Sequence, residues 1–427
     1  MPATLNALTR SSLTPEQQER NFVLGVIDGM LFRLWMVLTD VPVVLTWFVG
    51  SLTDSPLVVG LLQPIHDAGW MLPQLLVAGI TQRMPHKMRM YRLTVVGRAT
   101  CWAVAAALPF MIGPGNPTLL LTSFLAVYGA KCLLAGANTP AWSDIVAKSI
   151  PADRRGAFAS WRDFGGGVAG IVVGVATRYV LDERRGLAFP YNFGVVFALA
   201  LVPLVGAFLC FSQVKEAEEP PTTGRGLVDA AAVAAVWRDP NFVRFLAARV
   251  ALQLTWAAVP FYAVYARTRL GAPTAMVSTY LSALTASAVA STLLWGRLCD
   301  RRGNRMVMLL TSLLTIVILL VPLGLGQSIS YTVFTMVFVL QGIIQSATMI
   351  FRMTFVMDLA PAGQRPVYSG LANTVVGVVA LAMIGAGGVV QVWGLEALFA
   401  LCLVCACVAP FLVWGIRDPK AAKGRAR

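Results

Sequence analysis

Long apolar segments separated by short polar breaks run through the whole chain. A hydrocarbon core about 30 Å thick needs roughly 20 apolar residues for each helical crossing. By this measure the sequence predicts twelve membrane spans, at residues 21–50, 55–80, 91–112, 117–147, 155–181, 190–213, 241–267, 275–297, 305–325, 328–358, 365–390 and 395–416. Backbone amides cannot stay unpaired in lipid, and these segments are too long and too non-alternating for barrel strands. Each span is therefore expected to be a helix, and the predicted fold class is an all-α membrane protein.

The composition supports a membrane location. The chain has 427 residues, of which 57% are hydrophobic and 13% charged, and its mean hydropathy is +0.71. An ordinary soluble domain carries roughly a quarter charged residues. The polar N-terminus lacks the apolar stretch of a cleavable signal peptide, so none is expected.

Positive charge is distributed unevenly along the chain. The net charge is +14, and most of the 34 Lys and Arg residues fall in the two tails and in the loops after even-numbered spans. Cytoplasmic loops of membrane proteins carry such an excess. We therefore expect a multi-pass protein of the plasma or inner membrane with both termini in the cytoplasm, and no nucleic-acid partner.

The sequence offers little for catalysis or for a cofactor. It has two histidines, no phosphate-cradling Gly-rich Lys motif and no convincing nucleophile pattern. The seven cysteines lie in or at the ends of spans, which argues against an extracellular disulfide framework. We expect neither an enzyme, nor a cofactor, nor a metal site.

The two halves of the chain repeat each other. Asn21 opens the first span as Asn241 opens the seventh, and Gly79 at the end of span two corresponds to Gly296 at the end of span eight. Repeated anchors in the same order argue for duplication of a six-helix unit. The predicted domains are a cytoplasmic tail (1–20), a first six-helix bundle (21–213), a cytoplasmic linker (214–240), a second six-helix bundle (241–416) and a cytoplasmic tail (417–427).

The polar segment WGRLCDRRGNR between spans eight and nine carries a motif. It follows the pattern G-x-L-[A/C]-D-R-x-G-[R/K]-[R/K] at Gly296, Leu298, Asp300, Arg301, Gly303 and Arg305, with Asn304 in place of the first terminal base. In this motif, together with the twelve spans, the inside termini and the central loop, the chain resembles the major facilitator superfamily. The resemblance implies two pseudo-symmetric six-helix bundles and secondary transport by alternating access around a central site.

The same loop is interpreted as a latch at the cytoplasmic ends of the helices. Gly296 is expected to let neighbouring helices approach closely, and Gly303 to supply the backbone freedom that a short turn requires. Asp300, at a helix end beside lipid, needs partners, which an adjacent helix N-terminus or an arginine can provide. The alternative is that this turn is charged for topology alone.

Span five is rich in glycine. Its FGGGVAGIVVG segment lacks the proline typical of proton-coupled drug antiporters. The glycines favour close helix packing. Drug export is therefore the less favoured transport function.

Polar residues near the middle of the spans mark the predicted site. A charge at the bilayer centre costs at least roughly 2.5 to 3.5 kcal/mol, so an ionisable residue there is a site candidate. The candidates are Arg33, His66, Asp67 and Lys131 in the first half and the neutral Gln253, Gln341 and Gln345 in the second. Asp40 follows Arg33 by seven residues and so returns to nearly the same helix face.

These charges allow two interpretations. Arg33 and Lys131, set against Asp67 and the shallower Asp40, favour a cavity for an anionic or zwitterionic solute. Alternatively, Arg33 and Asp40, or Lys131 and Asp67, neutralise each other and hold the bundle together.

A second layer of charges lies towards the cytoplasm. It comprises Arg98, Asp144, Arg162, Asp163 and Arg352. Arg162 and Asp163 are adjacent on one helix and cannot pair well with each other, so they are expected to reach other helices. We interpret this layer as an inner gate, with permanent stapling of the helices as the alternative.

The sequence thus predicts a proton-coupled secondary transporter of a small organic solute. Asp67 beside His66 is the first candidate for the coupling group and Asp28 the second. The expected partners are the solute, a proton or another coupling ion and the lipid bilayer, and a single chain is expected to function as a monomer. The alternatives are export of drugs or amphiphiles and a non-transporting assembly factor or sensor with the same fold.

Overall fold

The computed structural model describes residues 13–82, 84, 86–151, 154–182, 187–217, 230–360 and 365–417. Helices make up nearly all of this described part, which contains no strand. The first half holds α1 (Pro15–Leu38), η1 (Val41–Leu45), α2 (Thr46–Leu52), α3 (Pro56–Gly60), α4 (Leu62–Gln82), α5 (Lys87–Ile112), η2 (Gly113–Gly115), α6 (Pro117–Ser149), α7 (Arg155–Leu181) and α8 (Tyr191–Phe211). The second half holds α9 (Ala230–Trp237), α10 (Pro240–Thr255), η4 (Trp256–Ala258), α11 (Val259–Thr268), α12 (Met276–Arg302), α13 (Asn304–Gly324), η5 (Gly326–Ser328), α14 (Thr335–Leu359), α15 (Arg365–Ala382) and α16 (Gly385–Trp414).

The predicted all-α membrane fold is confirmed. Ten helical segments in the described part are long and apolar enough to cross a membrane. The predicted second span corresponds to α3 and α4, and the eleventh to α15 and the start of α16. Within α16 the backbone turns at Gly394, whose φ is 86°, so the boundary predicted between spans eleven and twelve falls at this kink. The helices are consistent with twelve crossings.

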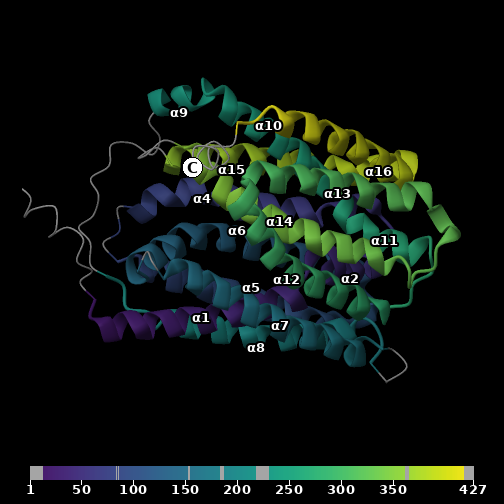
Figure 1. Ribbon diagram of the computed structural model, residues 1–427. Coiled ribbons are helices and arrows are strands. Elements are labelled where there is room, and N and C mark those ends of the chain that lie inside the picture. Colours follow the sequence, from purple (N-terminus) through teal and green to yellow (C-terminus); the bar gives the residue numbers. More distant parts are fainter. Residues whose placement is uncertain are drawn as a thin grey trace, which may run out of the picture.

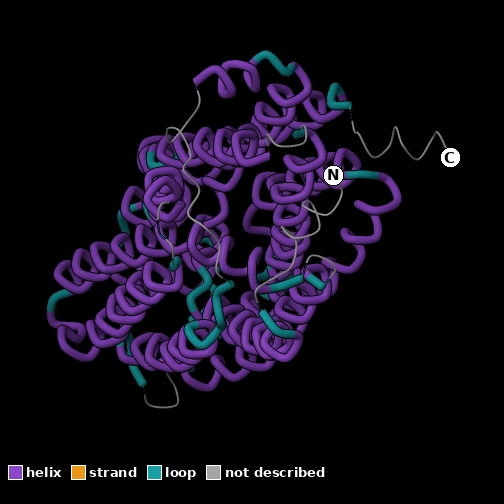
Figure 2. Tube along the Cα trace, turned by 90° about the vertical axis from the view of Figure 1, so that its left-hand side faces the viewer, coloured by secondary structure: helices purple, strands orange, loops and turns teal. Residues whose placement is uncertain are grey.

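Most helices share one long direction, and Figure 2 shows many of them end-on. In Figure 1 the C-terminus and α9 lie at the left end of the molecule, while α2 and α11 lie towards the right end. The surface between the two ends is apolar: Val202, Val392 and Phe411 are 71%, 70% and 80% exposed. Large exposed apolar side chains of this kind fit contact with lipid.

Spans one and seven are both interrupted, span one past its middle and span seven close to it. In span one, α1 gives way to the π-helical η1 before α2 begins, and in span seven the 3₁₀ turn η4 separates α10 from α11. The carboxylate of Asp40 accepts a hydrogen bond from Val43 N at 2.9 Å and so caps the start of η1. Interrupted membrane helices are typical of transporter binding regions.

The two halves use equivalent asparagines in the same way. Asn21 Nδ2 donates to the carbonyl of Lys215 and Asn21 Oδ1 accepts from its N–H, both at 2.9 Å. Asn241 makes the same pair of bonds with Arg417, at 2.9 and 2.8 Å. In each half the first helix is thus tied to the chain that follows the sixth span, which supports the repeat inferred from sequence.

The glycines of α7 pack closely on two sides, as their spacing predicts. A Cβ on Gly166 would lie 2.9 Å from the carbonyl oxygen of Met30 in α1, and one on Gly174 would lie 3.0 Å from Ser282 Oγ in α12. Without side chains at these positions, α7 fits between α1 of its own half and α12 of the other half. It is therefore one of the elements that join the halves.

Candidate functional site

Asp67 is the buried residue that links the two halves near the middle of the bundle. It is 5% exposed on α4, and its Oδ2 accepts a hydrogen bond from Gln253 Nε2 of α10 at 2.9 Å. His66 Nδ1 lies 3.0 Å from its Oδ1. Three of the residues selected from the sequence therefore meet at one carboxylate, and they come from both halves.

The second half brings further polar groups to this region. Gln341 of α14 is buried and its Nε2 has no hydrogen-bond partner among the described residues, while Gln345 on the same helix is half-buried. Arg352 of α14 lies within electrostatic range of Asp67. An amide without a partner in a buried region is available to a ligand.

Arg249 is a further candidate site residue, which the sequence pattern did not single out. It is buried on α10, one turn before Gln253, and donates to Asn373 Oδ1 at 2.9 Å, while its Nε and one terminal nitrogen have no partner in the described part of the chain. The sequence did contain a signal for it, because Arg249 interrupts an apolar run four residues before Gln253, which was selected. That spacing places both side chains on the same helix face.

Lys131 does not pair with Asp67, so that interpretation of the sequence is wrong. Its ammonium lies over the rings of Trp35 and Tyr128, 4.6 and 5.0 Å from their centres. Its one hydrogen-bond neighbour among the described residues is Cys132 Sγ, 3.9 Å away. Within the same residues, Lys131 is thus a buried cation that no carboxylate contacts.

Arg33 and Asp40 do not neutralise each other either. Arg33 donates from Nε to Asp163 Oδ1 of α7 at 2.8 Å, while Arg162 donates to Asp28 Oδ2 of α1 at 2.7 Å. Two ion pairs therefore cross between α1 and α7. The predicted pair is wrong because Asp40 lies beyond the end of α1, where it caps η1 instead of facing Arg33.

Asp144 and Arg98, two further charges of the inner layer, also find their neighbours within the first half, whereas Arg352 lies on α14 in the second half. Asp144 of α6 forms ion pairs with Lys87 of α5 and, at 2.8 Å, with Lys148 of its own helix. Arg98 lies against the rings of Phe32 and Phe208, 5.3 and 5.0 Å from their centres. Contacts confined to one half staple its helices together, which favours the stapling alternative for these residues in this conformation.

The loop between α12 and α13 differs from the predicted latch. Gly303 has a φ of 80°, so the expected need for glycine there is present. Gly296, in contrast, faces open space: a Cβ added to it would meet no described atom within 4 Å, so the expected close helix contact is not made there. Asp300 and Arg301 are exposed and make no hydrogen bond or ion pair with the described residues, while Arg305 lies 5.3 Å from the centre of the Trp414 ring.

Asn304 makes the contact that was expected of the charged residues of this loop. It is fully buried, donates from Nδ2 to Asp358 Oδ2 of α14 at 2.7 Å and accepts from Thr354 Oγ1 at 2.6 Å. The position where the sequence departs from the motif therefore anchors α13 to α14.

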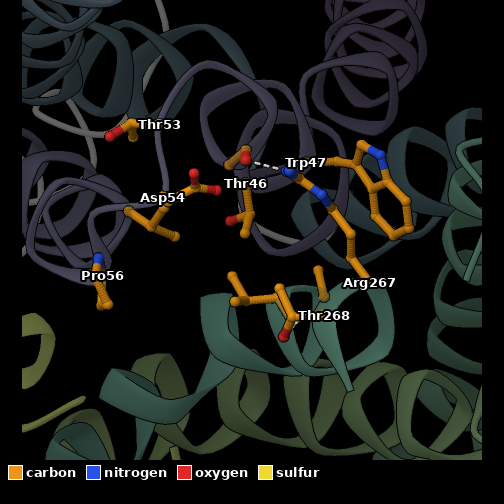
Figure 3. A pocket seen from close by; sticks show the side chains of 11 residues that line it. Thr46, Trp47, Thr53, Asp54, Pro56, Arg267 and Thr268 are labelled. Carbon is orange, nitrogen blue, oxygen red and sulfur yellow. Dashed lines mark hydrogen bonds between the residues drawn. The ribbon is translucent and has the colours of Figure 1, made fainter. Parts of the chain in front are cut away.

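A small cavity lies at the end of the bundle opposite the C-terminus, between the two halves. It has a volume of about 150 Å³ and is lined from α2 and its flanks by Thr46, Trp47 and Asp54 and from α11 by Arg267. Arg267 reaches across to the carbonyl of Gly50 (Figure 3). It also donates to Ser51 Oγ at 3.3 Å. None of the predicted site residues lines this cavity.

Solved structures of low sequence identity, all of membrane transporters, share the fold of this chain. The chain superimposes on a D-xylose–proton symporter with a TM-score of 0.69 at 14% identity, covering 94% of this chain and 98% of that one. A variant of the nucleoside transporter NupG gives 0.67 at 12% identity, covering 94% and 100%. The xylose transporter XylE from E. coli, in a partially occluded inward-open conformation, gives 0.64 at 12% identity, covering 95% and 99%.

Residues 245–427, somewhat less than half of the chain, match the sequence model of the Major Facilitator Superfamily. The resemblance drawn from the loop at 296–305 is thereby confirmed, with no subfamily specified. No curated protein sequence matches the chain.

Proposed function

We propose that this protein is a secondary transporter that moves a small organic solute by alternating access and performs no chemistry on it. The hydrogen bond between Asp67 of α4 and Gln253 of α10 carries this proposal. It places a buried carboxylate at the junction of the halves, where a solute can take the place of one partner. In the proposed cycle, two units, at residues 21–213 and 241–416, rock against each other around this junction.

A zwitterionic or anionic solute fits the charges around the junction. The carboxylate of Asp67 can face an ammonium group of the solute. Positive charge for an anionic group comes from Arg249, Arg352 and Lys131. Among the described residues no carboxylate forms an ion pair with these three. Arg33 no longer contributes, because Asp163 pairs with it. Buried ions without partners are costly, so their retention supports a ligand of opposite charge.

Proton coupling is proposed to act through Asp67. A protonated carboxyl loses its charge, so the hydrogen bond from Gln253 weakens and the halves separate more easily. His66, 3.0 Å from Asp67, is placed to exchange the proton. Asp28 is less suited, because its ion pair with Arg162 lies within the first half.

The conformation is proposed to be inward-facing. We also propose that the protein resides in the plasma or inner membrane and that both of its termini lie in the cytoplasm. Contacts at the end opposite the C-terminus support this proposal. There a Cβ on Gly60 of α3 would lie 2.9 Å from the backbone nitrogen of Gly387 in α16, and Arg267 bridges α11 and α2. Backbones this close keep solutes out at that end.

Transport by purified protein in liposomes tests the function. A panel of amino acids, organic anions, sugars, nucleosides and lipophilic cations is offered with and without an inward proton gradient. We expect uptake of a zwitterion or anion, and we expect the proton gradient to stimulate it. The Asp67→Asn variant is expected to transport at least tenfold more slowly and to lose the response to the gradient. Glu19→Gln, which removes a carboxylate from an exposed ion pair with Arg154, serves as the control.

Two outcomes would change the assignment. Transport of lipophilic cations alone would replace it with drug export. Uptake no greater than in empty liposomes across the panel would favour a non-transporting protein with this fold.

A further inference from the structure

Buried hydrogen-bond donors without an acceptor gather in the first half of the chain. Trp35 Nε1, Arg98 Nε and the Tyr128 hydroxyl have no hydrogen-bonded nitrogen or oxygen among the described residues. The Lys131 ammonium and the Tyr128 hydroxyl share one polar neighbour, the sulfur of Cys132, which is a weak acceptor. All four donor side chains are at most 5% exposed. Leaving a buried donor unsatisfied is energetically costly, and more so for a charged donor.

The four donors lie close together. They come from α1, α5 and α6. α6 packs against the other two helices, and Trp35 of α1 contacts Trp102 of α5. Lys131 Nζ is 4.6 Å and Arg98 Cζ 5.8 Å from the centre of the Trp35 ring, so one indole contacts both cations. Tyr128 stands one turn before Lys131 on α6 and contacts the same ammonium. We call these four residues the donor cluster.

Carboxylates near the donor cluster are engaged elsewhere. Asp28 forms an ion pair with an arginine of α7, Asp40 caps η1, and Asp67 bonds across to the second half. Aromatic rings offset only part of the cost of burying a cation. The cluster therefore still lacks an anion.

We propose that the donor cluster binds one small monovalent anion of the size of chloride or of a single carboxylate group. Its donors replace the hydration shell of the anion, whose charge balances one of the two cations, Arg98 and Lys131. The site lies within the first half and contains neither Asp67 nor Gln253. It extends the proposed transport function, because Lys131 also belongs to the charges around the Asp67 junction. The anion comes either from the solvent or from the carboxylate of a solute.

Equilibrium binding of radioactive chloride to the purified full-length protein tests the proposal. At constant ionic strength we expect saturable binding of one chloride per chain. Lys131→Gln is expected to weaken binding at least tenfold, and Tyr128→Phe, which removes only the hydroxyl, several-fold. Lys148→Gln on the same helix removes the same charge from an ion pair with Asp144 and is expected to bind chloride like the unmodified protein.

Competition identifies the source of the anion. Displacement of chloride by acetate and larger carboxylates supports a site for the carboxylate of a solute, whereas displacement by bromide and nitrate alone supports an inorganic anion. A higher melting temperature in chloride than in gluconate provides a second measurement and verifies that each variant is folded. Asp67→Asn is expected to keep anion binding, so loss of transport and loss of this site are distinguishable.

The proposal is overturned if neither chloride nor acetate binds saturably to the folded protein. Equal binding by the unmodified protein and by a folded Lys131→Gln variant would overturn it as well.

Discussion

Individual glycines matter here where one helix backbone meets another. A Cβ on Gly136 of α6 would lie 2.6 Å from the carbonyl oxygens of Gly69 and Trp70 in α4. In the second half, Gly342 of α14 meets the carbonyl of Leu284 in α12 in the same manner. The contact is thus repeated between equivalent helix pairs, although neither glycine belongs to the recognised motif.

Gly342→Ala is therefore expected to destabilise the protein. A helical glycine replaced by alanine normally gains about 1 kcal/mol, but overpacking against a backbone carbonyl costs about 1–3 kcal/mol, and here the added carbon has no room. Melting in detergent, followed by tryptophan fluorescence, measures the change. Gly296→Ala, on open surface of α12, is the matched control and is expected to melt at the same or a higher temperature.

Asn304 offers a second test at this scale. Asn304→Ala removes two short hydrogen bonds from a fully buried position and is expected to cost about 1–3 kcal/mol, because Asp358 loses its amide donor. Asn304→Asp is expected to be worse, since two carboxylates would face each other. The free energy of unfolding is compared with that of Asp300→Asn, an exposed position in the same loop. If Asp300→Asn lowers the free energy of unfolding more than Asn304→Ala does, the latch interpretation is restored.

Among the elements, α7 has the most distinctive role. One side of it holds the crossed ion pairs to α1, and its glycines bring it close to both α1 and α12. The two ion pairs differ in their surroundings: the side chains of Arg162 and Asp28 are 12% and 5% exposed, those of Arg33 and Asp163 36% and 48%. Burial decides how much each pair contributes.

Arg162→Gln is accordingly expected to destabilise the protein by about 3–5 kcal/mol, because it leaves the buried Asp28 unpaired. Arg33→Gln breaks the more exposed pair and is expected to cost at most about 1 kcal/mol. Thermal or denaturant unfolding of the two variants gives the comparison. The exchanged variant Asp28→Arg with Arg162→Asp is expected to recover part of the loss, and equal costs for the two single variants would contradict the assignment.

At the scale of the whole molecule, the two halves meet along several helix pairs, among them α7 with α12, α4 with α15 and α3 with α16. Figure 1 shows α7 and α12 side by side. Asp67 and Gln253 join the halves by a hydrogen bond, and Arg267 of α11 donates to the carbonyl of Gly50 in α2. Because Arg267 donates to a carbonyl at the C-terminal end of α2, it also interacts favourably with that helix dipole. A single arginine therefore contributes to closing one end of the proposed pathway.

Arg267→Gln is expected to open that end more often. A cysteine placed at Thr46, which is 1% exposed in the cavity, should then react at least several-fold faster with a membrane-impermeant maleimide. Arg269→Gln provides the control, since Arg269 pairs with Glu396 of its own half. An unchanged labelling rate in Arg267→Gln would exclude a gating role for this residue.

The sequence by itself determined the fold class and the repeat. Hydropathy over about 20 residues responds to the thickness of the bilayer, and the spacing of Asn21 and Asn241 survives in matching contacts. It also located Asp67, His66 and Gln253, because a polar residue in an apolar run is conspicuous whatever the packing.

Only the tertiary structure decided which of these residues meet. Helix periodicity placed Arg33 and Asp40 on one face. In the structure, α1 ends before Asp40, which caps η1, and Arg33 forms its ion pair with Asp163 instead. Lys131 likewise faces rings rather than Asp67. Pairing between helices depends on their rotation and distance, which no local pattern encodes, so the partners of buried charges had to be found in the fold.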